Sequence, residues 1–276
     1  MAKEFNLNFH QTFPPESSYL SRLFDIVGYN YSMSKEEISE LTGIPTGKSS
    51  GKVEPMIKYA QYMGLITDEI SEGKHNLSLT PLGEIVLAED MGFQEELTLW
   101  LCHARLCSVN GAPLWYEMIK HVLPKYNYDV KNIYIQDELE RVFQNKREIH
   151  IAPFYSSYAN MFKRLKIVEK SEETTTLKNN FLKNEFLYLY AYTVLYEWEA
   201  LYVDEHNTVL NEITGDEFES MMLPQTLGLS ETDFEKMLRL LEEHNIIKFN
   251  RQLVPYTVIK LANSKEILPL LYSLLN

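Results

Sequence analysis

The sequence predicts a mainly α-helical protein in which short β-hairpins follow some of the helices. Apolar residues recur at helical spacing over much of the 276 residues, as in the stripe within residues 17–29. A helix-start signal, Ser34 with Glu37 three residues later, precedes another such stripe. Short apolar runs at residues 65–67 and 76–79, separated by a polar turn, indicate a hairpin.

The first 90 residues follow the order of a winged helix-turn-helix unit. A helix, a short helix, a turn, a longer helix and a two-stranded hairpin are predicted in that order between residues 17 and 79. The short helix begins after Ser34 and ends at Gly43, and Thr80 is placed to cap the helix that follows the hairpin. We therefore predict an N-terminal winged helix-turn-helix over residues 1–90.

The rest of the chain divides into three predicted parts. Residues 91–150 form a helical linker region, with apolar stripes but no hairpin signal. Residues 151–206 hold a short helix, a hairpin and a long Tyr-rich helix, and are a possible second winged-helix module. Residues 207–276 repeat the helix-then-hairpin pattern and are a possible C-terminal module. The predicted fold is thus a mainly α protein with small β-hairpin wings, built of winged helix-turn-helix modules joined by a helical middle region.

The charge is acidic overall and uneven along the chain. Lys and Arg number 26 against 39 Asp and Glu, a formal net charge of −13, which excludes a uniformly basic nucleic-acid coat. Residues 140–190 hold 9 basic and 6 acidic side chains, whereas residues 191–276 hold 6 and 14. Any contact with nucleic acid must therefore come from local basic patches.

Local positive charge lies at the turn and first turns of the predicted recognition helix, where phosphates and major-groove edges would be met. The candidate DNA-binding residues there and in the wing are Lys48, Ser49, Ser50, Lys52, Lys58, Lys74, His75 and Asn76. A second basic patch is predicted from Arg141, Lys146, Arg147, Lys163 and Arg164. The alternative is that these lysines are simply solvated and contact no partner.

Two functions are compatible with this pattern. The first is a non-enzymatic protein that binds double-stranded DNA, as a regulator or targeting subunit of a DNA-modification or defence system. The second is a protein–protein adaptor that uses winged-helix modules as docking units, with a partner held by the acidic C-terminal segment. The 18 tyrosines favour the adaptor, because aromatic residues are good interface anchors. A homodimer is possible, although no heptad run specifies one.

No motif predicts catalysis, a metal or a cofactor. Residues 43–49 have three residues between the glycines where a Walker A loop has four. Cys102, His103 and Cys107 lack the repeated spacing of a zinc site, and buried thiols are the simpler interpretation. In the segment before the first helix, His10 and Thr12 either satisfy backbone groups or form a contact loop.

Targeting signals are also missing from the pattern. The N-terminus lacks the apolar core of a signal peptide. The most apolar run, residues 186–196, is about half the length that a bilayer requires. We therefore expect a cytoplasmic protein with no membrane contact.

Several motifs in the first part of the chain resemble a known family. They are residues 9–14 (FHQTFP), 43–48 (GIPTGK), 59–66 (YAQYMGLI), 79–83 (LTPLG) and 98–103 (TLWLCH). Together they are similar to the bacterial family catalogued as domain of unknown function 4007. The resemblance covers about the first 105 residues, and Phe9 stands where the family usually has Gly.

The resemblance implies a winged-helix DNA-binding protein, often encoded near DNA phosphorothioation and other phage-defence genes. The family has no assigned catalytic residues, so none is carried over to this chain.

Overall fold

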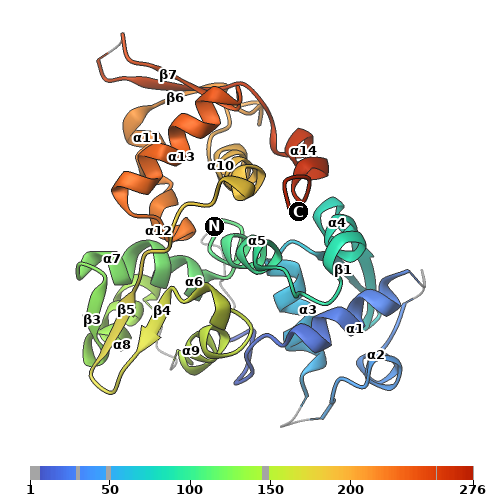
Figure 1. Cartoon of the computed structure of the whole chain (residues 1–276). Coiled ribbons are helices and arrows are strands. Elements are labelled where there is room, and N and C mark those ends of the chain that lie inside the picture. The colour runs from blue at the N-terminus through green and yellow to red at the C-terminus, as the bar shows by residue number, and fades with distance from the viewer. Residues whose placement is uncertain (1–6, 29–31, 48–50, 145–148, 253, 276) are drawn as a thin grey trace.

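The protein is mainly α-helical with three small antiparallel sheets (Figure 1). The computed structural model describes residues 7–28, 32–47, 51–144, 149–252 and 254–275. Within these ranges no helix is both long enough and apolar enough to cross a membrane.

The N-terminal part begins with three helices and a hairpin, in the predicted order. Its elements are α1 (Ser17–Val27), α2 (Lys35–Thr42), α3 (Val53–Tyr62), β1 (Ile66–Ser71) and β2 (Lys74–Leu79). The Ser34 side chain accepts from the Glu37 amide while the Glu37 carboxylate accepts from the Ser34 amide, so the predicted capping box is present. Thr80 caps the next helix, α4 (Pro81–Asp90), as predicted.

The middle part combines a helical layer with the second sheet. Its elements are α5 (Glu96–Leu106), α6 (Pro113–Glu117), the π-helical η1 (Met118–Val122), α7 (Leu123–Lys125), β3 (Asp129–Lys131), α8 (Asn132–Phe143), α9 (Ala152–Ala159), η2 (Lys163–Leu165), β4 (Val168–Lys170) and β5 (Thr174–Leu177). The region 91–150 is therefore not purely helical, because β3 pairs with β5 in the order β3-β5-β4. A three-residue strand with one apolar residue gives no period-2 signal in the sequence.

The C-terminal part contains the long helix and the third sheet. Its elements are η3 (Asn184–Phe186), α10 (Leu187–Leu201), β6 (Glu212–Thr214), α11 (Gly215–Ser220), α12 (Leu223–Leu227), α13 (Glu231–Glu243), β7 (Ile247–Asn250), β8 (Thr257–Lys260), α14 (Ser264–Ile267) and η4 (Leu268–Leu270). The strand order is β6-β8-β7.

One topology occurs three times along the chain. A short leading strand is followed by helices and a hairpin, and it pairs with the second hairpin strand: β3 with β5, and β6 with β8. In the first part a single bridge between Met33 and His75 occupies the position of the leading strand. The predicted repetition of one supersecondary unit agrees with this topology, and its assignment as a winged helix stays a prediction.

Helices α5 and α10 lie at the centre of the molecule (Figure 1). Ten of the fifteen residues of α10 are buried, because α5, α13 and α14 cover it on several sides. A helix that is apolar around most of its circumference is typical of such an interior position. The three sheets are therefore arranged around a common helical core.

Candidate functional site

Lys52, one of the predicted DNA contacts, is neutralised in the structure by a nearby carboxylate. Its Nζ lies 2.6 Å from Glu16 Oε1, and it also lies over the rings of Phe13 and Tyr19, at 5.4 and 5.3 Å from their centroids. A phosphate would have to compete with this carboxylate and with the two aromatic faces. Lys48, Ser49 and Ser50, predicted beside Lys52, lie outside the described residues.

Helix α3, the predicted recognition helix, contributes mainly to the core. Six of its ten residues are buried, and the ring of Tyr59 packs edge-on against Trp115 of α6. Glu54 is its exposed charge, and Lys58 is half-buried and donates to Gln61 Oε1 at 2.8 Å. This leaves little cationic helix surface for a DNA groove.

The wing residues also have partners within the chain. Lys74 Nζ lies 3.8 Å from a Glu37 carboxylate oxygen. His75 is buried, with Nδ1 2.9 Å from Asp68 Oδ2. Asn76 accepts a hydrogen bond from Ser32 through its side-chain oxygen. The hydrogen bond of His75 therefore lies within the hairpin, and that of Asn76 joins the hairpin to the segment before α2.

The second predicted basic patch is distributed over separate elements. Arg141 on α8 pairs with Glu138 at 2.9 Å, and Arg164 in η2 donates to the Gln94 carbonyl. Lys163 is exposed beside Arg164. Lys146 and Arg147 fall outside the part of the chain that the structure describes.

His10 belongs to the core, whereas Thr12 is exposed. The His10 ring is fully buried against Phe9 and Trp115, with Nδ1 3.0 Å from the Gln11 carbonyl oxygen. Burial lowers the pKa of His10 to about 4, so the ring is neutral at physiological pH. For His10 this arrangement agrees with the structural interpretation of the segment.

Cys102 and Cys107 are free and buried, and burial raises the pKa of both thiols. His103 lies between Tyr158 and the Thr226 carbonyl, with Nδ1 2.9 Å from the tyrosine hydroxyl. Among the described residues no group of three potential metal ligands is close enough to hold an ion.

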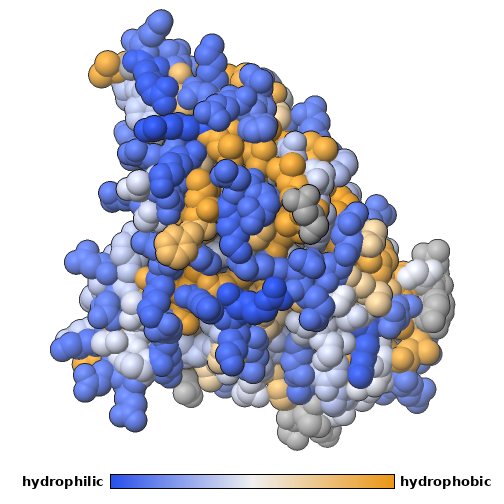
Figure 2. Space-filling view, in the orientation of Figure 1, coloured by the Kyte–Doolittle hydropathy of each residue, from blue (hydrophilic) through white to orange (hydrophobic). Residues whose placement is uncertain are grey.

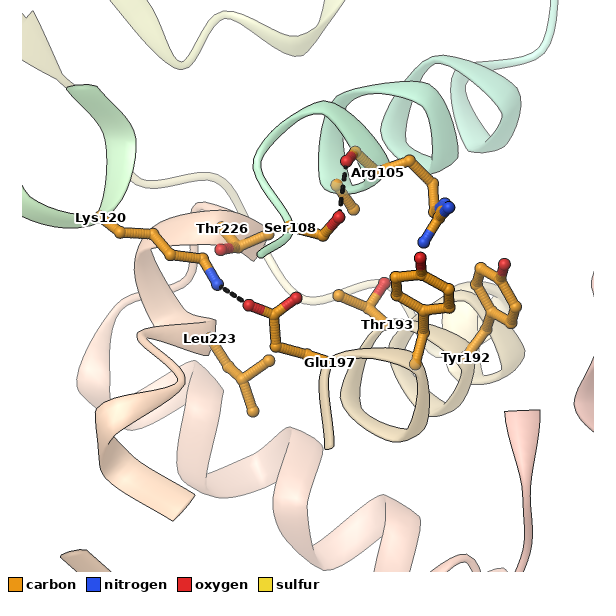
Figure 3. Close-up of a pocket in the computed structure, with 10 residues that line it drawn as sticks. Arg105, Ser108, Lys120, Tyr192, Thr193, Glu197, Leu223 and Thr226 are labelled. Carbon is orange, nitrogen blue, oxygen red and sulfur yellow. Dashed lines mark hydrogen bonds and ion pairs between the residues drawn. The ribbon is translucent and has the colours of Figure 1, made fainter. Parts of the chain in front are cut away.

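A buried ion pair joins the middle and C-terminal parts, and the sequence patterns did not indicate it (Figure 3). Lys120 and Glu197 are 1% and 3% exposed, and their Nζ and Oε1 atoms lie 2.5 Å apart. Lys120 also donates to the Met221 carbonyl, and the Val109 amide donates to the Glu197 carboxylate. The adjoining cavity is only about 10 Å³, room for one water molecule. The pair therefore links the two parts, and the cavity beside it has no space for a substrate.

A much larger hollow lies beside α13. This α13 groove has a volume of about 840 Å³, in the range of ligand-binding pockets. Figure 2 shows apolar side chains at the surface in the recess between the C-terminal part and the rest of the molecule. The groove is lined by Tyr128, Asn179, Phe218, Glu219, Met222, Pro224, Gln225, Leu229, Ser230, Glu231, Thr232, Phe234, Glu235, Leu238 and Tyr256.

One face of α13 forms a wall of the groove. Glu231 and Glu235 are four residues apart, as are Phe234 and Leu238, and the two pairs are offset by three, so all four share that face. Phe234 and Leu238 are half-buried and both glutamates are exposed. The buried Met237 belongs to the core-facing side of the helix. The sequence carries this mixed acidic and apolar stripe, but only the fold shows that a hollow lies beside it.

The opposite wall is fixed by a close contact. A Cβ atom on Gly215 would lie 2.3 Å from the Tyr256 ring, so only glycine leaves space for that ring. The Tyr256 hydroxyl donates to Glu219 Oε1 at 2.8 Å. Burial and this hydrogen bond raise the pKa of Tyr256 to about 12.

The lining of the groove is acidic. It includes three glutamates, Glu219, Glu231 and Glu235, and neither a lysine nor an arginine among the described residues. An adjoining hollow of about 540 Å³ shares Glu235, Leu238 and Tyr256 and extends to two arginines, Arg239 and Arg251. Their guanidinium groups lie 3.7 Å from a Glu235 oxygen and 3.6 Å from a Glu242 oxygen, respectively. The groove can accept apolar and cationic groups and disfavours phosphates.

Comparisons with known proteins bear on the fold. No protein-family model and no curated protein sequence matches this chain. Two solved structures are similar to it, a magnesium ion-bound SspB and an SspB. They superimpose with a TM-score of 0.72 each at 15% and 14% identity; the alignments cover 99% and 97% of this chain, and 89% and 86% of the other chains. At this identity the likeness shows a shared fold, and the resemblance to the domain-of-unknown-function family stays a prediction.

Proposed function

We propose that this protein is a non-enzymatic adaptor that docks a protein partner in the α13 groove. The observation that carries the proposal is the outer face of α13, where apolar residues alternate with carboxylates beside a hollow of about 840 Å³. Half-buried aromatic and aliphatic side chains in a recess are typical anchors of protein interfaces.

The three helices that precede the hairpins argue against DNA as the main ligand. Helix α3 is largely buried, and α9 (APFYSSYA) carries no charged residue. Helix α13 presents Glu231 and Glu235 to its groove. Within the residues that the structure describes, none of these helices presents the cationic face that phosphate contacts need.

The rest of the fold is suited to holding such a groove rigid. The C-terminal part is joined to the middle part by the buried Lys120–Glu197 pair and by the packing of α10 on α5. A preorganised site loses less entropy when a partner binds. The resemblance to the family found near phosphorothioation genes suggests a partner from a DNA-modification system.

Binding to a purified partner tests the proposal. Candidates identified by co-purification are expressed, and their affinity for the full chain is measured by calorimetry. We expect Phe234→Ala and Leu238→Ala each to weaken binding about tenfold or more, because both remove apolar contact area from the groove. Ile133→Ala is the matched control, since Ile133 is 71% exposed on α8, outside the groove.

A DNA experiment decides against the alternative. Gel shifts with random duplex DNA at low salt should show no complex at micromolar protein. A salt-dependent shift that Lys52→Ala and Lys58→Ala reduce, together with partner binding that is insensitive to Leu238, would replace the adaptor with the DNA-binding function.

A further inference from the structure

The α13 groove also indicates what kind of partner segment it accepts. Two of its acidic residues, Glu231 and Glu235, lie one helical turn apart with Phe234 between them on the same face. Glu235 has Arg239 at 3.7 Å, but both of these side chains are about 70% exposed, so the contact is easily exchanged. An incoming cation can therefore pair with the carboxylates at the rim.

The floor of the groove offers a further polar contact. Gln225 donates from Nε2 to the Tyr128 hydroxyl at 3.0 Å, while its Oε1 is buried with no hydrogen-bond partner in the described structure. A buried acceptor without a donor is unfavourable, so a ligand that turns the Gln225 amide toward the groove and supplies an N–H group would satisfy it. A peptide backbone or a lysine side chain supplies such a donor.

An exposed aromatic side chain extends the apolar surface beyond the groove. Phe181 is 82% exposed. It follows Asn180, whose amide donates to the Gly228 carbonyl next to the groove residue Leu229. Large exposed aromatic residues next to a recess are typical of interfaces. Phe181 therefore places an exposed apolar side chain close to the Leu229 edge of the groove.

We propose that the α13 groove binds a short basic and apolar segment of a protein partner, with Lys or Arg residues beside apolar anchors. The anchors contact Phe234 and Leu238, and the cations pair with Glu231 and Glu235. This inference rests on the proposed function, and it adds the chemistry of the segment that the groove selects.

Three peptide series provide the test. Each is a fluorescent 12-residue library with apolar residues at fixed positions and Lys, Gln or Glu at all the others, titrated against the full chain. We expect the Lys series to bind about tenfold more tightly than the Gln series and the Glu series to bind most weakly. The preference for Lys should decrease as salt rises.

The double variant Glu231→Gln with Glu235→Gln separates charge selection from folding. Both side chains are exposed, so the fold should persist, and the preference for Lys over Gln should fall about fivefold or more. Glu172→Gln with Glu173→Gln, in the exposed turn between β4 and β5, is the control with the same change in net charge.

The outcomes distinguish this inference from the proposed function. If all three series bind equally and binding requires Leu238, the groove is a docking site but the charge selection is wrong. If no series binds, or binding ignores Leu238, the inference is overturned, and the experiment with the purified partner decides the proposed function separately.

Discussion

The buried pair of Lys120 and Glu197 gives the strongest prediction for stability. Replacing Lys120 by Met keeps an apolar side chain of similar length but leaves the Glu197 carboxylate with the Val109 amide as its remaining described donor. Removing one partner of a buried ion pair costs about 3–5 kcal/mol, because the other charge stays buried without compensation. We expect that loss in the free energy of unfolding.

The size of the chain converts this loss into a temperature shift. An unfolding entropy of about 2.1 cal/mol/K per residue gives about 0.6 kcal/mol/K for 276 residues. Lys120→Met should therefore lower Tm by about 5–9 °C, measured by differential scanning calorimetry.

A double variant tests whether the cost comes from the unpaired Glu197 charge. Lys120→Met with Glu197→Gln removes both charges and keeps an acceptor for the Val109 amide, so it should be more stable than Lys120→Met alone. If Lys120→Met costs less than about 1 kcal/mol, or if the effects of the two changes on the free energy of unfolding are additive, the ion pair does not couple the two parts.

Three further predictions concern local structure and pH. Ser34→Ala removes the cap of α2 and should cost about 1 kcal/mol in urea unfolding, with an unchanged slope. Gly83→Ala places a Cβ 1.9 Å from the Leu65 carbonyl oxygen and should lower the free energy of unfolding by about 3 kcal/mol. Gly28→Ala is the control: no atom lies within 4 Å of its Cβ, so it should be neutral or stabilising by up to about 1 kcal/mol. Equal effects of the two variants would contradict the packing at Gly83. Burial lowers the pKa of His103 from 6.5 to about 4, so the unfolded chain binds a proton first, and stability should decrease as pH falls from about 6.5 to 4. His103→Gln should reduce by about one the number of protons taken up on unfolding in this pH range, so the free energy of unfolding should change less with pH. Urea unfolding at several pH values measures this slope.

Features encoded by neighbouring residues were predictable from the sequence. The capping box at Ser34, the N-cap at Thr80 and the hairpin of β1 and β2 depend on residues only a few positions apart. Strand β3 was missed, because its formation depends on pairing with β5 more than 40 residues later. Local patterns do not contain such partners.

The candidate site was predictable only in part. The acidity of the C-terminal segment predicts a protein contact, but it does not indicate the groove. The contact of Lys52 with Glu16 joins residues 36 positions apart, and no local pattern shows that this carboxylate neutralises the lysine. In the same way, Tyr128, Leu229 and Tyr256 meet around one hollow only because three separate elements pack together.

Hydrogen–deuterium exchange of the full chain with its purified partner tests whether the partner docks on α13. We expect slower exchange in α13 and around Tyr256 when the partner is present, and unchanged exchange in α3 when duplex DNA is added. Protection confined to α3 and the β1–β2 turn on addition of DNA, with none in α13 on addition of the partner, would contradict it.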